Sequence, residues 1–168
     1  VSDNSTIYAY DGGVWKTVGD RKVREICHYA LRNRNSQRLF GEVKHHIRSN
    51  PMLRIDRDEL GAPAGTIAVE NGLLDLRNRE LRELKPEDYA QSRVPTEFDP
   101  NADYENTEWI NFLNDVVRDD DLEKLQEYAG YTLWHHEQPF GKALFLVGPT
   151  DSGKGTFLKV LESVLGQD

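Results

Sequence analysis

The stretch Val69-Glu70-Asn71-Gly72-Leu73-Leu74-Asp75-Leu76 decides the fold class of this chain. Asn71-Gly72 separates two short apolar runs, and this pair favours a tight turn because both residues tolerate a positive φ. We therefore predict short strands at Thr66–Glu70 and Leu73–Leu76, and a third at Leu81–Leu84. The expected result is a small sheet built from hairpins.

A second hairpin is predicted near the start of the chain. The β-rich runs Ile7–Tyr10 and Val14–Val18 flank Asp11-Gly12-Gly13, whose glycines can adopt a positive φ. Asp20 then stands where a helix N-cap is expected. Apolar residues follow it at helical spacing, namely Val23, Ile26, Cys27, Ala30 and Leu31. Another helix is predicted from about residue 36 to 49, ended by Asn50-Pro51.

Helical spacing returns in the second half of the chain. It is carried by Trp109, Phe112, Leu113, Val116 and Val117. Asp120, with Glu123 three residues later, resembles a capping box at the start of a further helix. Residues 85–105 contain three prolines and predict an irregular internal linker. The predicted fold class is α+β, with a mostly helical body and short β-hairpins.

Composition excludes several classes of protein. The 168 residues are 38% hydrophobic and 30% charged, which suits a globular chain. No run approaches the roughly 18 apolar residues that a membrane-spanning helix needs. The single cysteine, Cys27, excludes an internal disulfide framework and is expected to be a buried, inert thiol. We predict a soluble protein of the cytoplasm that has no membrane partner.

Charge is sorted along the chain, although the net charge is −8. Between Arg21 and Arg57 there are ten Lys or Arg residues and three acids. Between Glu97 and Glu137 there are twelve acids and two basic residues. This asymmetry indicates one region that faces a polyanion and another that is solvated or faces protein.

The segment with the clearest chemistry is Gly148-Pro149-Thr150-Asp151-Ser152-Gly153-Lys154, which fits the phosphate-loop pattern G-x-x-x-x-G-K. A buried strand, Ala143–Val147, is predicted before it and an amphipathic helix after it. The N–H groups of such a loop and the helix dipole favour a polyphosphate, to which Lys154 adds a positive charge. The alternative is a glycine-containing turn that matches the pattern by chance.

One position departs from the pattern. Gly155 stands where Ser or Thr would ligate magnesium, and a hydroxyl one residue later, on Thr156, points about 100° away on a helix. We expect Thr156 to contact a phosphate, with the metal held by water and by a later acid. Hydrolysis needs an acid after a second apolar strand, and none follows the loop before Asp168. The chain is therefore expected to be a fragment without its own catalytic residues.

Five segments, in order along the chain, share a family pattern: Ile7–Trp15, Val69–Leu76 with Glu80-Leu81, Phe98–Ala102, Leu125–Leu133 and Phe145–Leu158. Together they resemble the C-terminal region of phage and plasmid primases, which are superfamily III helicases related to poxvirus primase-helicases. The resemblance spans almost the whole chain.

This resemblance implies an ATP-driven motor that moves along single-stranded DNA during replication, assembled as a homo-oligomeric ring, expected to be a hexamer. Residues 1–135 would form the domain that precedes the helicase, and residues 136–168 the start of an AAA+-like α/β ATPase domain. ATP and Mg²⁺ would be the cofactors of the intact parent. The predicted nucleotide-binding residues are Gly148, Pro149, Thr150, Asp151, Ser152, Gly153, Lys154, Gly155 and Thr156.

Other residues are candidates for DNA or metal contacts. The predicted contacts to a DNA backbone are Arg32, Arg34, Arg38, Lys44 and Arg48. The alternative is a solvated helical face that balances the acidic half of the chain. His45-His46 and His135-His136 have no further ligand at metal spacing, so we expect surface or packed histidines. Trp15 and Trp109 are favoured as core residues over base-stacking residues.

Two other functions stay open. Gly-Lys-Gly-Thr also occurs in adenylate-kinase-like phosphotransferases, but their loop lies near the N-terminus, whereas here 147 residues precede Gly148. The second alternative is a non-enzymatic module for DNA binding or oligomerisation, in which the loop plays no part.

Overall fold

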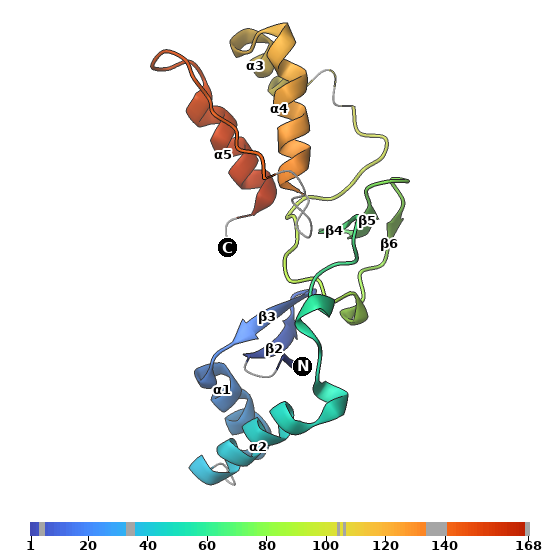
Figure 1. Cartoon of the computed structure of the whole chain (residues 1–168), viewed down its shortest axis with the longest axis vertical. Coiled ribbons are helices and arrows are strands. Elements are labelled where there is room, and N and C mark those ends of the chain that lie inside the picture. Colours follow the sequence, from blue (N-terminus) through green and yellow to red (C-terminus); the bar gives the residue numbers. More distant parts are fainter. Residues whose placement is uncertain (4–5, 33–35, 104, 106, 134–140, 167–168) are drawn as a thin grey trace. The chain divides into compact units, whose positions relative to one another are not determined.

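Two three-stranded antiparallel sheets and five α-helices form the described part of the chain, which is an α+β protein as predicted. The computed structural model describes residues 1–3, 6–32, 36–103, 105, 107–133 and 141–166 (Figure 1). The chain divides into two compact units. The first comprises residues 1–62 and 85–92, and the second comprises residues 63–84 and 93–168. The predicted domain boundary, between residues 135 and 136, lies outside the described residues and stays a prediction.

The sheet of the first unit confirms the hairpin predicted near the start of the chain. Its strands lie in the order β1 (Ser2–Asp3), β2 (Thr6–Asp11) and β3 (Val14–Val18). Gly12 and Gly13 close the turn with φ values of 59° and 88°. Such φ values suit glycine because it has no Cβ.

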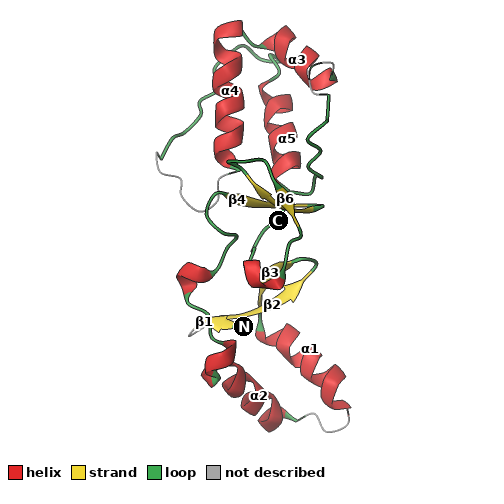
Figure 2. Cartoon of the chain, turned by 90° about the vertical axis from the view of Figure 1, so that its right-hand side faces the viewer, coloured by secondary structure: helices red, strands yellow, loops and turns green. Residues whose placement is uncertain are grey.

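Two helices lie on one side of this sheet (Figures 1 and 2). They are α1 (Asp20–Leu31) and α2 (Gln37–Ser49), which share a core of Ile7, Val23, Cys27 and Phe40. Ser36 caps α2, because its side chain accepts a hydrogen bond from the Leu39 N–H at 3.2 Å. The prediction of Asp20 as the N-cap of α1 was wrong. Gly19 is the N-cap, and the Asp20 carboxylate pairs with Lys44 of α2 instead.

The predicted linker contributes to both units. Residues 85–92 belong to the first unit, where the backbone N–H of Trp15 donates to Ala90 O at 2.7 Å and its indole N–H donates to Pro86 O at 2.7 Å. Residues from 93 onward belong to the second unit, where Val94 N–H donates to Ala68 O at 2.9 Å. The segment is irregular, as expected, but backbone hydrogen bonds anchor it at both ends.

The sheet of the second unit confirms the hairpin around Asn71-Gly72. It consists of β4 (Thr66–Val69), β5 (Gly72–Asp75) and β6 (Leu81–Arg82) in that order. Gly72 has a φ of 155°, and a Cβ at this position would collide with the carbonyl oxygen of Arg82. The close approach of β6 therefore requires glycine here.

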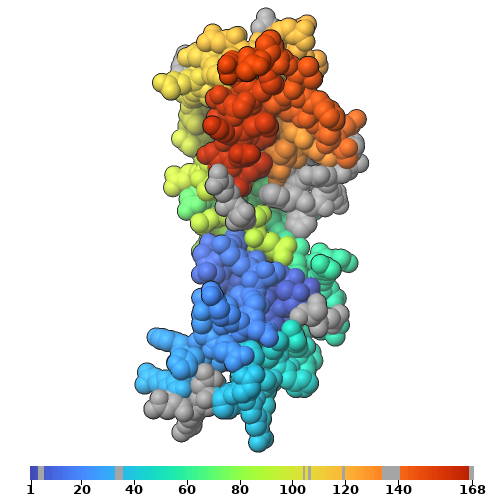
Figure 3. Space-filling view, turned by 90° about the vertical axis from the view of Figure 1, so that its left-hand side faces the viewer, coloured from blue at the N-terminus to red at the C-terminus, as the bar shows by residue number. Residues whose placement is uncertain are grey.

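Three further helices pack together in the second unit: α3 (Glu108–Val116), α4 (Asp119–Thr132) and α5 (Lys154–Leu165). Their shared core contains Leu113, Leu125 and Phe157. Figure 3 shows α5, in red, directly beside α4, in orange. The predicted capping box at Asp120 was wrong, because α4 begins one residue earlier and Arg118 is its N-cap.

The segment before the predicted phosphate loop differs from expectation. Ala143–Val147 is not a strand and pairs with no strand among the described residues. Leu144 and Leu146 pack against the core of α3, α4 and α5, while Phe145 and Val147 are 84% and 95% exposed. Burial alternates along this apolar run as it would in a strand, but the run has no neighbouring strand with which to form a hydrogen-bonded ladder. The described residues therefore show no α/β phosphate-loop domain, and that part of the prediction is not confirmed.

Candidate functional site

The predicted phosphate loop ends at the N-terminus of a helix. Residues 148–153 have no regular secondary structure, and α5 begins at Lys154. The first hydrogen bond of the helix runs from Phe157 N–H to Gly153 O at 3.0 Å. The preceding N–H groups of a helix have no acceptor within it, and with the helix dipole they form a site that favours anions.

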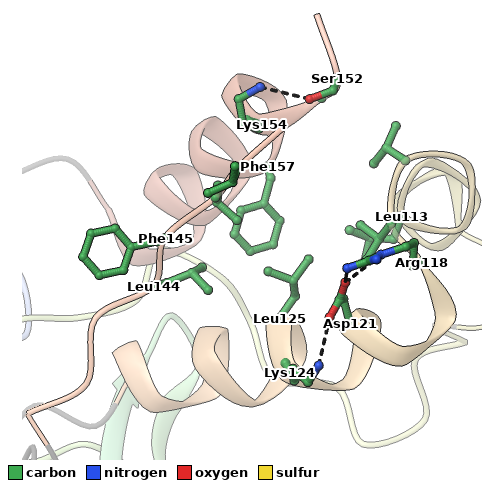
Figure 4. Close-up of a pocket in the computed structure, with 15 residues that line it drawn as sticks. Leu113, Arg118, Asp121, Lys124, Leu125, Leu144, Phe145, Ser152, Lys154 and Phe157 are labelled. Carbon is green, nitrogen blue, oxygen red and sulfur yellow. Dashed lines mark hydrogen bonds and ion pairs between the residues drawn. The ribbon is translucent and has the colours of Figure 1, made fainter. Parts of the chain in front are cut away.

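The side chain of Lys154 turns back onto this loop (Figure 4). Its ammonium donates to Gly148 O at 3.0 Å, to Pro149 O at 2.5 Å and to Ser152 Oγ at 3.0 Å. A lysine ammonium has three N–H donors, so these acceptors engage all of them. A phosphate oxygen can bind the ammonium only by replacing at least one of these loop oxygens.

Helix α3 supports the loop at Gly153. This glycine has a φ of 83°, and a Cβ placed on it would lie 3.1 Å from a ring carbon of Phe112 and 3.2 Å from Val116. Both the left-handed backbone and the close approach of α3 therefore favour glycine. The position of the loop depends on α3 as well as on α5.

None of the predicted nucleotide-binding residues is fully buried. Ser152, Gly153 and Lys154 are half-buried, and the other members of the set are exposed. Thr156 lies in the first turn of α5, two residues after Lys154. A polyphosphate can therefore reach the loop and the helix N-terminus from solvent.

The next question is whether side chains of the described residues could hold a metal ion. Within the described residues, no group of three or more His, Cys, Asp or Glu side chains is placed to hold a metal ion. Gly155 has no side-chain oxygen to offer at the position where the loop pattern has a hydroxyl. Gly155 therefore cannot ligate magnesium through a side chain, and binding of phosphate by the loop stays a prediction.

The predicted DNA-binding residues lie in the first unit. Arg38 pairs with Glu42 at 2.9 Å, and Lys44 pairs with Asp20. The hydrogen bond from Lys44 lowers the pKa of the Asp20 carboxyl, so the carboxylate form is favoured. The Arg38 and Glu42 side chains are 90% and 56% exposed, so their ion pair is weak and a DNA phosphate could take the place of Glu42. Arg34 lies outside the described residues.

The remaining members of the basic set occupy helix ends. Arg32 is the C-cap of α1 with a φ of 47°, and Arg48 lies in the last turn of α2. Cations near a helix C-terminus interact favourably with the helix dipole. These positions suit either a structural role or a phosphate contact, so DNA binding stays a prediction.

Several candidate residues have structural roles. Cys27 is a buried thiol, as expected. Trp15 makes tilted ring contacts with Tyr10 and Tyr89, and Trp109 stacks on Phe112 and Phe157. Trp15 and Trp109 are therefore partly buried, each packed against the core of its own unit. His45 and His46 are exposed on α2, whereas His135 and His136 lie outside the described residues.

Sequence reasoning missed a charged cluster at the start of α4. Arg118 donates to Asp121 Oδ2 from Nη2 at 2.7 Å and from Nε at 3.1 Å. Lys124 donates to Asp121 Oδ1 at 2.9 Å. The hydrogen bonds from Lys124 and Arg118 lower the pKa of Asp121, and the one to Asp121 raises the pKa of Lys124. The three-residue spacing on one helical face could have indicated this cluster.

A comparison with known families supports the resemblance seen in the sequence. The family described as "D5 N terminal like" matches residues 1–118, more than half of the chain. The chain belongs to this family. The D5 N-terminal-like domain is found in phage and plasmid primase-helicases of the superfamily III type. No curated protein matches the chain. The family match ends before the predicted phosphate loop, so nucleotide binding is a separate question.

No helix among the described residues combines the length and apolar character needed to cross a bilayer.

Proposed function

We propose that this chain works in a phage- or plasmid-type primase-helicase, in which residues 148–156 bind the phosphates of ATP. One observation carries the proposal. A chain with a D5 N-terminal-like domain also has a glycine–lysine loop at the start of a helix, with the lysine ammonium held over that loop. Loops of this kind bind polyphosphates through backbone N–H groups and a lysine charge.

Each part of the loop has a distinct task in this proposal. The N–H groups at the start of α5 bind phosphate oxygens, and Lys154 exchanges loop oxygens for the β- and γ-phosphates. Gly153 lets the backbone approach the ligand closely. Magnesium, when bound with the nucleotide, would neutralise phosphate charge. The chain itself contributes phosphate binding and orientation.

The proposal extends to DNA and to assembly. The primase-helicase would hydrolyse ATP in a homo-oligomeric ring, a hexamer, and move along single-stranded DNA. Arg32, Arg34, Arg38, Lys44 and Arg48 would contact the phosphate backbone. Such contacts carry no base readout, so binding would be independent of sequence and sensitive to salt.

Calorimetric titration of the whole chain with inorganic tripolyphosphate tests the phosphate site. Lys154→Ala is expected to weaken binding by about tenfold or more, because a charge-assisted contact is lost. Lys159→Ala is the matched control, since Lys159 is an exposed lysine further along the same helix. Equal binding by all three proteins would show that the loop is not the phosphate site.

A further inference from the structure

A cavity of about 630 Å³ lies beside the predicted phosphate loop, within the second unit. The loop contributes Ser152, Gly153 and Lys154, and the end of α3 with the first turns of α4 forms the opposite wall (Figure 4). The space has the size of known small-molecule sites, about 300–1,000 Å³.

Nine of the residues that line the cavity have apolar side chains, and polar groups line the rest. The apolar lining residues are Leu113, Val116, Val117, Leu125, Leu144, Phe145, Leu146, Val147 and Phe157. In Figure 4, Leu144 and Leu125 point toward each other across the space. Apolar walls of this kind can cover the faces of a flat ring system.

The charged groups of the cavity are mainly cationic. Lys154, Arg118 and Lys124 line it together with one carboxylate, Asp121. Asp121 holds both Arg118 and Lys124, at 2.7 Å and 2.9 Å, and so orients their side chains. The combination of net positive charge and apolar walls fits an anionic ligand with an apolar body.

We propose that this cavity binds the nucleoside portion of the triphosphate whose phosphates lie on residues 148–156. The inference rests on the proposed function and adds to it a subsite formed by α3 and α4. The Arg118 guanidinium is planar and can stack on a base, and it has five N–H donors, of which two go to Asp121. Lys124 directs one of its three donors to Asp121. The other donors of both side chains can bind base or ribose oxygens and nitrogens.

Comparison of ATP with inorganic tripolyphosphate tests this subsite. Calorimetry on the whole chain is expected to show that ATP binds more tightly than tripolyphosphate. The double variant Arg118→Ala and Lys124→Ala is expected to weaken ATP binding about tenfold, because contacts from charged donors are lost. Its tripolyphosphate binding is expected to change less than about threefold, because the phosphates lie on the loop.

The chain contains a matched control for this variant. Arg21 and Lys22 each pair with Glu25 at 3.7 Å on the exposed face of α1. This arrangement resembles the one in which Arg118 and Lys124 share Asp121. Arg21→Ala with Lys22→Ala removes the same two charges from the other unit and is expected to leave both affinities unchanged. Equal weakening by the two double variants would mean that only overall charge matters, and the subsite would be rejected.

The remaining outcomes separate the subsite from the phosphate site. If tripolyphosphate binds in a Lys154-dependent manner and ATP is no tighter, the subsite is wrong while the phosphate site stands. If the double variant Arg118→Ala with Lys124→Ala binds ATP as tightly as wild type does, the subsite is also wrong. If neither ligand binds the wild-type chain, the proposed function fails, and the subsite fails with it.

Discussion

The ammonium of Lys154 and the hydroxyl of Ser152 lie 3.0 Å apart, and the ammonium donates the hydrogen bond between them. Two loop carbonyls, from Gly148 and Pro149, accept its other two bonds. The loop oxygens therefore hold the lysine charge in the place from which it would meet a phosphate. This arrangement predicts that charge at position 152 controls anion binding.

Ser152→Asp is expected to abolish tripolyphosphate binding, or to weaken it by more than about tenfold. The new carboxylate would pair with the Lys154 ammonium and would repel the incoming anion. Ser163→Asp adds the same charge to an exposed position later in α5 and is expected to leave binding within about threefold. Calorimetric titration of both variants checks the prediction. Binding that survives in Ser152→Asp would place the phosphate elsewhere.

Replacing either of two glycines at the start of α5 by alanine is expected to change the free energy of unfolding, in opposite directions at the two positions. Gly153→Ala should lower the free energy of unfolding by about 1–2 kcal/mol, because its φ is 83° and the Cβ would press on Phe112. Gly155→Ala should raise it by about 0.5–1 kcal/mol, because the residue is helical and nothing lies within 4 Å of its Cβ. Urea unfolding followed by circular dichroism measures both. A stabilising Gly153→Ala would mean that α3 does not pack on the loop.

Local chemistry was sufficient to predict most of the secondary structure. The glycine-bearing turns at residues 11–13 and 71–72 define both hairpins, because φ values above zero restrict which residues fit there. Apolar spacing located α1, α2, α3 and α5. The caps were less predictable: Asp20 and Asp120 have the right residue type, but each lies inside its helix rather than at the cap. Ion pairing with Lys44 gives Asp20 another role.

Tertiary packing accounts for what the sequence did not reveal. Apolar spacing cannot show whether Ala143–Val147 finds a strand partner, since pairing depends on distant segments. The cavity beside the loop is formed by residues 30 or more positions apart, such as Leu113 and Leu144. The local sequence pattern located the loop at the start of α5, but its role in phosphate binding stays a prediction. The sequence also could not show that Arg118, Asp121 and Lys124 line this cavity.

The ion pairs of Asp121 predict a pH-dependent contribution to stability. Hydrogen bonds from Lys124 and Arg118 lower its pKa in the folded chain. The contribution is therefore fully present above the unfolded pKa, about 3.9, and is lost as pH falls through the lower, folded pKa. Asp121→Asn should thus be less stable than wild type at neutral pH, and the difference should shrink in acid. Urea unfolding at neutral pH and in acid measures this difference, and Asp120→Asn, at the neighbouring position, is the control. A difference that does not change with pH would contradict the pairing.

Salt dependence distinguishes DNA binding from a solvated basic face. If Arg32 contacts a phosphate, Arg32→Gln should weaken binding to a single-stranded thymidine oligonucleotide. It should also reduce the slope of log K against log salt concentration by about 0.7, the share of one phosphate contact. Arg38→Gln should do the same, even though Arg38 pairs with Glu42, because an exposed ion pair is readily exchanged. Fluorescence anisotropy at several salt concentrations measures both quantities.

The matched control for these variants is Arg77→Gln, which removes an exposed arginine from the other unit. Its slope is expected to equal that of wild type, because Arg77 is not one of the predicted phosphate contacts and a surface charge acts only within about 10 Å at moderate salt. If all three variants lose the same slope, binding depends on overall charge and not on the predicted face. If wild type does not bind the oligonucleotide even at low salt, the basic helices have a structural role, since their carboxylates already supply the partners that DNA phosphates would replace.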